Sequence, residues 1–261
     1  LISRIWLPNS NGPWPALLMR QPYGREIAST ITYSHPEWWA SKGYMVIIQD
    51  VRGMGSSEGV FNGFSQEASD TSETHEWVRS LKECNGKLGL YGFSYQGFTQ
   101  LTGELNSKPP DCLSPAMTGM NIKDHWCSDG GAYWWHNNIA WGLQIAALKM
   151  KREKKLLEWE KIRLALENKS YLREGIDILK KYDPNSFVLE WLKNLNNARP
   201  FEEFKPISTW IKQPMLIIGG LWDPHLKGAF DLYKKSKEAG GSPEIIICLL
   251  YTSDAADDNT C

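Results

Sequence analysis

The sequence has no hydrophobic run long enough to cross a lipid bilayer as a helix. It also lacks an excess of charge of either sign, because 29 lysines and arginines oppose 30 aspartates and glutamates, for a net charge of −1. Proteins that bind nucleic acid or anionic membranes usually carry a basic excess. The composition therefore predicts neither nucleic acid nor a membrane as a partner.

Cysteine is scarce, and its spacing indicates neither a disulfide framework nor a metal site. The five cysteines include no CxxC pair, and no cluster of ligand residues suggests a metal. We therefore expect no metal and no organic cofactor. Unpaired cysteines favour a reducing compartment, so the cytoplasm is favoured. The localisation stays open, because the sequence begins at Leu1 without Met, and we expect upstream residues, with any signal peptide, to be missing.

The composition changes abruptly at the C-terminal end. Glu244–Ile247 is typical of a core strand, but from Cys248 the sequence becomes small and acidic and resembles a translated sequencing adapter. We expect native sequence to stop near Ile247 and residues 248–261 to be a non-native tail. The alternative is a natural acidic tail. A foreign tail would leave Cys84, Cys112 and Cys127 as the native cysteines.

Tryptophan is abundant. There are thirteen in 261 residues, and many lie between Trp126 and Trp141. A local cluster of this kind indicates a wall or lid more than an evenly spread core.

The segment Gly92-Phe93-Ser94-Tyr95-Gln96-Gly97 has the pattern of a nucleophile turn. An apolar strand is predicted before it at 87–91, and a helix that runs on through 98–102 is predicted after it. A tight turn from strand to helix exposes a serine hydroxyl at the edge of a sheet, and small residues must flank it. Ser94 is therefore the predicted nucleophile. Against the general G-x-S-x-G motif, Gln96 replaces the second glycine, so that a polar residue in an ordinary turn is the alternative.

The rest of the chain alternates strands with helices. The predicted strands are 3–7, 16–19, 45–49, 114–117, 214–220 and 244–247, and the predicted helices are 35–42, 67–81 and 227–238. In helix 67–81 the predicted buried face comprises Ala68, Thr71, Trp77, Val78 and Leu81, and Asp70, Glu73 and Arg79 are predicted to face solvent, with His75 a structural residue. This order predicts the α/β class, with a mostly parallel, doubly wound sheet and helices on both faces.

Residues 124–205 break the alternation. They are predicted to be helical, and charge runs such as 149–155 are solvated helix faces. We interpret 124–205 as a helical cap inserted between two parts of the sheet domain, 1–123 and 206–247.

A dinucleotide-binding loop is a competing interpretation of the segment after strand 45–49. Gly53 and Gly55 match the first two glycines of G-x-G-x-x-G, but the third position is Glu58. A carboxylate there would repel a pyrophosphate, so this interpretation is disfavoured.

Four segments together resemble one family of serine hydrolases. They are R-Q-P-Y-G-R at 20–25, D-V-R-G-M-G-S-S-E-G at 50–59, E-A-S-D-T-S-E-T-H-E-W at 67–77 and N-G-K-L-G-L-Y-G-F-S-Y-Q-G at 85–97. The family contains bacterial cocaine esterase, the α-amino-acid ester hydrolases, glutaryl acylases and Xaa-Pro dipeptidyl peptidases (the CocE/NonD type). Its motif is G-x-S-Y-x-G, which Gly97 matches. The resemblance implies an α/β-hydrolase fold with a helical cap.

The resemblance also implies roles for residues of this chain. Ser94 would be the acyl-accepting nucleophile, with the backbone N–H of Tyr95 and the hydroxyl of Tyr23 as the two oxyanion donors. The alternative for Tyr23 is ordinary loop packing beside Pro22. Asp223, which follows a strand after the nucleophile in chain order, would be the triad acid. The family usually shows G-W-x-D there, whereas the tryptophan of this chain is shifted by one position to Trp222. The alternative role for Asp223 is a helix N-cap.

The implied substrate pocket lies in the cap. Trp126 and Trp141 have the spacing of two tryptophans that line the acyl pocket in the cocaine esterase branch, with packing between cap and core as the alternative. His225 lies too close to Asp223 in sequence to be the triad base, so we expect it to line the pocket, with a simply exposed side chain as the alternative. The triad histidine is expected to be absent from this chain, which would make it a nearly inactive fragment.

The predicted function is hydrolysis of an ester or amide bond, in a small acyl compound or an Xaa-Pro peptide, through an acyl-enzyme on Ser94. The sequence does not decide among these substrates or give an oligomeric state. Asp129 is a candidate to bind the free amine of a peptide. The alternative function is a non-catalytic scaffold that binds carbohydrate or peptide in a Trp-rich groove.

Overall fold

The computed structural model describes residues 1–26, 33–195 and 207–249. A seven-stranded sheet runs through it in the order β1-β3-β2-β4-β5-β8-β9. The strands are β1 (Ser3–Trp6), β2 (Trp14–Gln21), β3 (Met45–Asp50), β4 (Cys84–Phe93), β5 (Cys112–Ala116), β8 (Leu216–Gly220) and β9 (Glu244–Cys248). β1 pairs with β3 in the antiparallel sense, and the other pairs are parallel.

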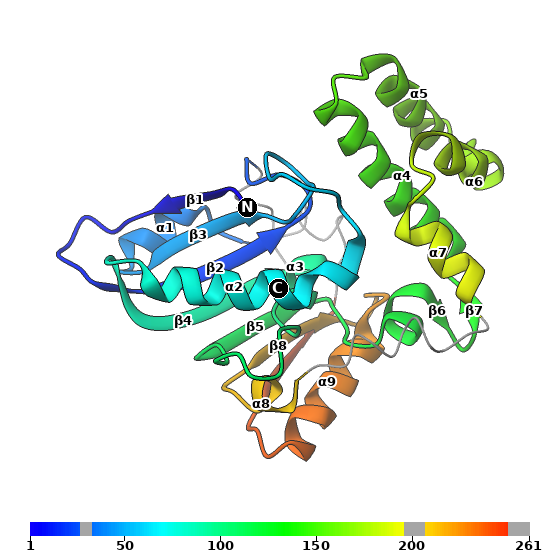
Figure 1. Cartoon of the computed structure of the whole chain (residues 1–261). Helices are drawn as coiled ribbons and strands as arrows, with labels where there is room; N and C mark the ends of the chain where they lie inside the picture. The colour runs from blue at the N-terminus through cyan, green and yellow to red at the C-terminus, as the bar shows by residue number, and fades with distance from the viewer. Residues whose placement is uncertain (27–32, 196–206, 250–261) are drawn as a thin grey trace.

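Alternate residues of the central strands enter two different hydrophobic clusters, as the period of two in a strand requires. Leu18 and Ile47 pack with Val78 of α2 (Glu67–Ser80) and with residues of α9 (Leu226–Glu238). Their neighbours Met19 and Ile48 pack on the other face, with residues of α1 (Pro36–Ser41). Helices therefore cover both faces of a mostly parallel sheet (Figure 1), and the predicted α/β fold class is confirmed.

Helix α2 has the predicted span, but the predicted burial of several side chains is wrong, including that of Arg79, which was expected to face solvent and is only 10% exposed. Asp70, expected to face solvent, is 3% exposed, and it accepts two hydrogen bonds from the guanidinium of Arg52. Trp77, expected in the core, is 37% exposed. The pairing of Asp70 depends on a residue 18 positions earlier in the chain, which the helical period cannot reveal. His75 is buried and stacks on Trp210 at 5.2 Å between ring centroids, as expected of a structural residue.

The helix after Ser94 is shorter than predicted. α3 spans only Tyr95–Phe98. Beyond it the backbone forms hydrogen bonds between residues three apart, from Gln100 N to Gly97 O and from Leu101 N to Phe98 O. The Gln100 side chain holds this turn against β5, because its amide bonds both the N–H and the carbonyl of Ser114. Hydrogen bonds of the side chain thus compete with continuation of the helix.

Four consecutive helices of the described chain follow β7 (Ala132–Tyr133) and form a bundle. They are α4 (Trp135–Arg152), α5 (Leu156–Glu167), α6 (Tyr171–Tyr182) and α7 (Phe187–Asn194). Before them come a π-helical turn, η2 (Lys123–Cys127), and a short hairpin of β6 (Ser128–Asp129) and β7, which the prediction of a helical segment missed. The bundle α4–α7 lies on the side of the sheet toward which β2 runs (Figure 1).

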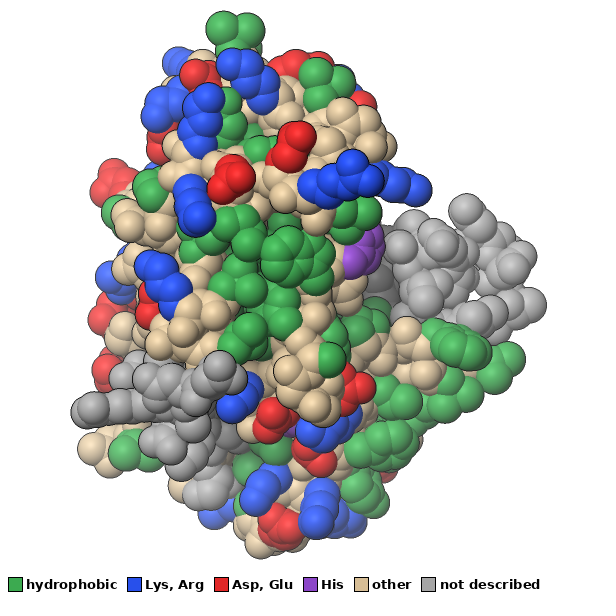
Figure 2. Space-filling model, turned by 90° about the vertical axis from the view of Figure 1, so that its right-hand side faces the viewer, with side chains coloured by type: hydrophobic (Ala, Val, Ile, Leu, Met, Phe, Trp, Pro, Cys, Tyr) green, Lys and Arg blue, Asp and Glu red, His purple; other side chains and the backbone are tan. Residues whose placement is uncertain are grey.

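The outer surface of the bundle carries many charged side chains at the top of the view in Figure 2. A band of hydrophobic side chains lies below them, in the middle of the same face. None of the described helices is long and apolar enough to span a membrane. The remaining short helices are η1 (Gly63–Gln66) and α8 (Ser208–Ile211). β9 ends at Cys248, and residues 250–261 of the predicted foreign tail lie outside the described residues.

Candidate active site

Ser94 lies between the end of β4 and the start of α3, with φ 56° and ψ −125°. This backbone conformation is unfavourable for any residue with a Cβ, and such strain gathers at functional sites. The amide of Ser94 donates to Ala116 O on β5 at 2.9 Å, which fixes the turn to the neighbouring strand. The half-buried Ser94 thus stands at the carboxyl end of the central strands.

The glycines on either side make this turn possible. Gly92 has φ 142°, and a Cβ there would lie 2.5 Å from the Cβ of Gln96. A Cβ on Gly97 would lie 2.7 Å from the Cγ2 of Thr118. Both distances are below van der Waals contact, so the turn excludes larger residues at these two positions.

Tyr95 is anchored below the turn by a buried polar network. Its hydroxyl donates to Glu67 Oε1 at 2.8 Å, and Arg20 donates to Glu67 Oε2 at 2.8 Å. Burial is the main cause that raises the pKa of both the Tyr95 phenol and the Glu67 carboxyl. Sequence reasoning assigned no role to Arg20 or Glu67, although both lie in the segments that carry the family resemblance.

Tyr23 follows β2 and lies beside the predicted nucleophile. Its side chain interacts with those of Ser94 and Trp141, and burial raises the pKa of its phenol to about 12 despite these contacts. A phenol with such a pKa keeps its proton at neutral pH. Tyr23 is therefore a hydrogen-bond donor that lies next to the Ser94 side chain.

Asp223 follows β8 and is 5% exposed. Its Oδ1 accepts the backbone N–H of His225 at 2.8 Å, whereas its Oδ2 is buried and has no hydrogen-bond partner among the described residues. Burial raises the pKa of this carboxyl to about 6. The N-cap position of α9 is His225, and the bond that Asp223 Oδ1 accepts from the N–H of His225 lies in the turn that precedes it. Asp223 thus presents a free carboxylate oxygen within the protein.

His225 is held by the backbone of η2. Its Nδ1 lies 2.6 Å from the carbonyl oxygen of His125, which can only accept, so Nδ1 carries the proton. Burial lowers the pKa of His225 to about 4, and the neutral ring then has Nε2 as an acceptor. The ring lies 4.4 Å from that of Trp126. His125 itself is engaged with Asp231, at 2.8 Å from Nε2 to Oδ2.

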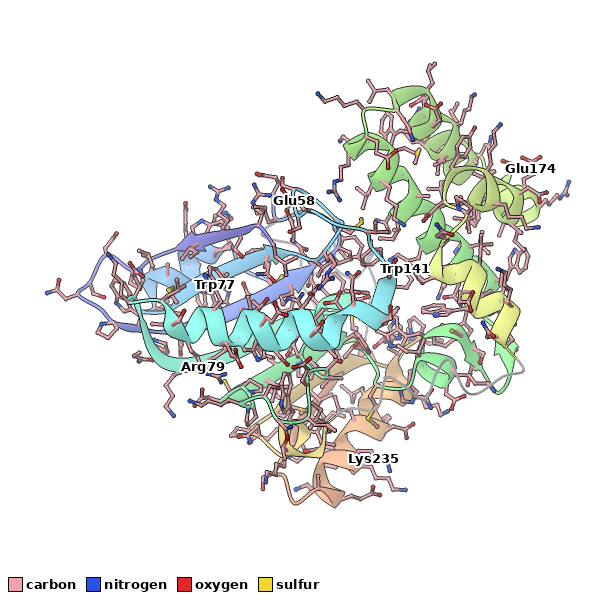
Figure 3. The ribbon with its side chains drawn as sticks, viewed as in Figure 1. Glu58, Trp77, Arg79, Trp141, Glu174 and Lys235 are labelled. Atoms are coloured by element: carbon pink, nitrogen blue, oxygen red, sulfur yellow. The ribbon has the colours of Figure 1, made fainter. Side chains whose placement is uncertain are left out.

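The two predicted pocket tryptophans meet. The rings of Trp126 and Trp141 are 5.9 Å apart, and Trp141 lies 6.1 Å from the ring of Tyr95. Trp126 is only 3% exposed, and Trp141 is half-buried, in the first half of α4 (Figure 3). The cluster also includes rings that sequence reasoning missed: Phe64, Phe98, Phe187 and Trp191.

A continuous path of contacts therefore connects the seven predicted site residues. It runs from Ser94 through Tyr23 and Trp141 to Trp126 and His225, and the turn at His225 reaches Asp223. Tyr95 joins it through its own ring contact with Trp141. Asp129, the candidate amine ligand, is exposed on the β6–β7 hairpin. Among the described residues, no group of three or more His, Cys, Asp or Glu could hold a metal ion.

The Gly-rich loop after β3 surrounds the carboxylate of Asp50, where the competing interpretation would place a nucleotide. Asp50 accepts hydrogen bonds from the backbone N–H groups of Arg25 and Ser56, and from the Arg25 guanidinium at 2.7 Å. A Cβ on Gly55 would lie 2.3 Å from the carboxyl carbon of Asp50. The glycine thus accommodates a carboxylate of the chain itself, which explains the Gly-rich pattern there.

The sheet order, the turn at Ser94 and the helices on both faces define the α/β-hydrolase fold. A model of the X-Pro dipeptidyl-peptidase (S15 family) matches residues 1–249, and the chain belongs to this family of hydrolases. The predicted resemblance is thereby confirmed. The chain is also 29% identical to the cocaine esterase of Rhodococcus sp. (strain MB1 Bresler) over 145 residues, which is 54% of this chain and 25% of that protein.

Solved structures share the fold at low sequence identity. A CocE/NonD family hydrolase from Staphylococcus aureus is 18% identical, with a TM-score of 0.73 over 97% of this chain and 44% of its own. An α-amino-acid ester hydrolase is 18% identical, with a TM-score of 0.62 over 94% of this chain and 45% of its own. The chain thus spans a quarter of the curated relative and less than half of these structures.

Proposed function

We propose that this chain carries the nucleophile, the oxyanion donors and the acid of a serine hydrolase that cleaves an ester or amide bond through an acyl-enzyme on Ser94. The observation that carries the proposal is the strained backbone of Ser94 at the carboxyl edge of the sheet, with the Tyr23 phenol beside its side chain. Strain of this kind is retained where it presents a reactive group.

In the first step the Ser94 oxygen bonds to the substrate carbonyl carbon, and the hydroxyl proton passes to a general base. The carbonyl oxygen becomes an oxyanion, which the Tyr23 hydroxyl and the Tyr95 backbone N–H stabilise. Collapse of this intermediate breaks the bond to the leaving group, which takes the proton. Water then attacks the acyl-enzyme, releasing a carboxylic acid and restoring Ser94.

Asp223 is the proposed acid. It would orient a histidine and stabilise its charged form through the free Oδ2. The five histidines of the chain are all described, and none donates a ring N–H to Asp223: His125 bonds Asp231, and His225 bonds a backbone carbonyl. We propose that the base is a histidine that lies outside this chain, so that the chain alone has little activity.

The aromatic cluster supports a substrate with an apolar or aromatic group. Trp141 contacts both Tyr23 and the ring of Tyr95, so an acyl group on Ser94 would meet this side chain. The family includes X-Pro dipeptidyl peptidases, and the curated relative is a cocaine esterase. We therefore propose small esters, amides or Xaa-Pro peptides as the substrate class.

Covalent labelling tests the nucleophile. A fluorophosphonate probe should label the full-length protein at Ser94, and peptide mass spectrometry should locate the adduct there. Ser94→Ala should abolish labelling, whereas Ser56→Ala, in the loop after β3, should leave it intact. An adduct that persists in Ser94→Ala would overturn the assignment.

A second candidate is a non-catalytic scaffold that binds substrate in the aromatic cluster without turnover. It is favoured by the observation that no histidine side chain of the described chain bonds the carboxylate of Asp223. Binding of a phenyl ester that quenches tryptophan fluorescence, with no burst of released alcohol from the full-length protein, would favour it.

A further inference from the structure

Gln96 occupies the position at which the general nucleophile motif has a glycine, and its side chain is almost fully buried. It is 2% exposed, and its Oε1 accepts the backbone N–H of Phe93 at 3.2 Å. Its Nε2 donates to Oε1 of Gln21 at 2.8 Å. The departure from the motif thus places an amide between the turn at Ser94 and the end of β2.

Gln21 continues the connection. It is fully buried, and its Nε2 donates to the carbonyl of Gly24 at 3.0 Å. This carbonyl lies one residue after Tyr23, in the loop that presents the phenol beside Ser94. Three consecutive hydrogen bonds therefore join the residue before the nucleophile to the residue after the proposed oxyanion donor.

The direction of the three bonds is fixed at both ends. Phe93 contributes a backbone N–H, which can only donate, and Gly24 contributes a carbonyl, which can only accept. Each glutamine amide has one donor group and one acceptor group, so both amides have a single orientation that satisfies the series. Glutamate or a hydrocarbon side chain at either position would interrupt it.

We propose that Gln96 and Gln21 are positioning residues that hold the Tyr23 hydroxyl in register with Ser94 for oxyanion stabilisation. The inference rests on the proposed function. It goes beyond that function because it makes the turnover rate depend on the glutamine in the nucleophile motif. Oxyanion donors act only when they are held where charge develops, so loosening the Tyr23 loop should affect turnover more than substrate binding.

Gln100 is a matched control on the same turn. It is also 2% exposed, and its Nε2 bonds carbonyl oxygens of Gly92, Gln96 and Ser114 at 3.1 to 3.3 Å. These bonds join the turn to β5 and not to the loop of Tyr23. Replacement of Gln100 by methionine therefore removes a comparable set of buried hydrogen bonds without interrupting the series through Gln21.

The test is a double-mutant cycle on the full-length protein with a nitrophenyl ester. Gln96→Met and Gln21→Met should each lower kcat about 10- to 100-fold, with KM changed by less than about threefold. Tyr23→Phe should lower kcat about 100-fold. Gln96→Met added to Tyr23→Phe should lower kcat by less than about twofold more, because the group that Gln96 positions is already gone.

The control separates positioning from general damage. Gln100→Met should lower the melting temperature as Gln96→Met does, and its smaller effect on kcat should multiply with that of Tyr23→Phe. Equal losses of kcat in Gln96→Met and Gln100→Met, or a Gln96→Met loss that multiplies fully with that of Tyr23→Phe, would overturn the inference. If Gln96→Met does not fold, Gln21→Met gives the same comparison, since it leaves the bond between Phe93 and Gln96 intact.

Failure of the proposed function has a different signature. If Ser94→Ala retained hydrolysis and labelling, the site itself would be wrong, whatever the glutamine variants did. If Ser94→Ala were inactive while the cycle showed no coupling, only the positioning role would fall.

Discussion

At the scale of single residues, the buried carboxyl group of Asp223 accepts only one hydrogen bond among the described residues. Burial raises its pKa to about 6, above the ordinary value of 3.8. The folded state therefore holds the proton more tightly than the unfolded state. As pH rises from about 4 to about 6, the Asp223 carboxyl ionises first in the unfolded chain. The free energy of unfolding therefore falls by about 3 kcal/mol over this range.

Asp223→Asn should remove this loss. The variant should be more stable than the parent chain above about pH 6, by up to about 3 kcal/mol, and the advantage should vanish below about pH 4. Urea unfolding of the chain between pH 3.5 and 8 measures the difference. Asp129→Asn, at an exposed position, is the control, and its stability should follow that of the parent chain across the whole pH range. A constant difference between Asp223→Asn and the parent across the range would contradict the prediction.

Side-chain roles at this scale were only partly accessible from sequence. Ser94 could be singled out because its glycines and flanking strand are adjacent in the chain. The pairing of Asp70 with Arg52 and of Gln96 with Gln21 could not, because these partners lie 18 and 75 residues apart. Local periodicity carries no information on which buried polar groups will meet.

At the scale of secondary-structure elements, the bundle contains a buried ion pair. Nζ of Lys149, on α4, lies 2.8 Å from the carboxylate of Asp183, which ends α6, and the two side chains are 15% and 8% exposed. Lys149 also lies over the ring of Phe61, at 5.7 Å from its centroid. Removing one partner would leave the other charge buried and unpaired.

Lys149→Met should therefore destabilise the bundle by about 3 kcal/mol. Amide hydrogen exchange should accelerate in α6 and α7 more than in β4. Adding Asp183→Asn should recover part of the loss, since no charge is then left unpaired. Arg163→Met, which removes exposed pairs with Glu160 and Glu167, should destabilise the bundle much less than Lys149→Met does. Equal losses in the two single variants would contradict this account.

Elements were predicted best where a regular pattern meets a clear boundary. The apolar runs of β2, β3 and β8 and the spans of α1 and α9 agree with expectation. The early end of α3 and the β6–β7 hairpin were missed, because each depends on contacts with distant parts of the chain or on two-residue strands too short for periodicity to reveal. The role of residues 124–205 as a cap stays a prediction.

At the scale of the whole molecule, the ring of Phe64 lies at a junction between the sheet and the bundle. Phe64, on η1, is 2% exposed, and its ring contacts those of Tyr95 at 5.0 Å, Trp126 at 5.1 Å and Trp191 at 5.4 Å. These partners belong to α3, η2 and α7. The three segments therefore share one hydrophobic cluster, which should make the chain unfold as a single unit.

Phe64→Ala should cost about 3 to 5 kcal/mol and split the thermal transition in two, because the bundle loses the ring contacts that Phe64 makes with α3, η2 and α7. Calorimetry, with near-ultraviolet circular dichroism to follow the tryptophans, would measure both effects. Phe230→Ala makes the same deletion at a side chain that is 50% exposed and should cost less than about 1 kcal/mol. A single unchanged transition in Phe64→Ala would show that the coupling lies elsewhere.

The backbone at Ser94 has a consequence for engineering. Its φ of 56° and ψ of −125° suit glycine, which adopts such angles without a steric penalty. Mutations that relieve strain at a functional position commonly stabilise a protein at the expense of its activity. A directed-evolution campaign that selected this chain for heat resistance alone would therefore tend to discard the serine itself. Thermostable variants that keep Ser94 should come from libraries that are screened for turnover in the same round.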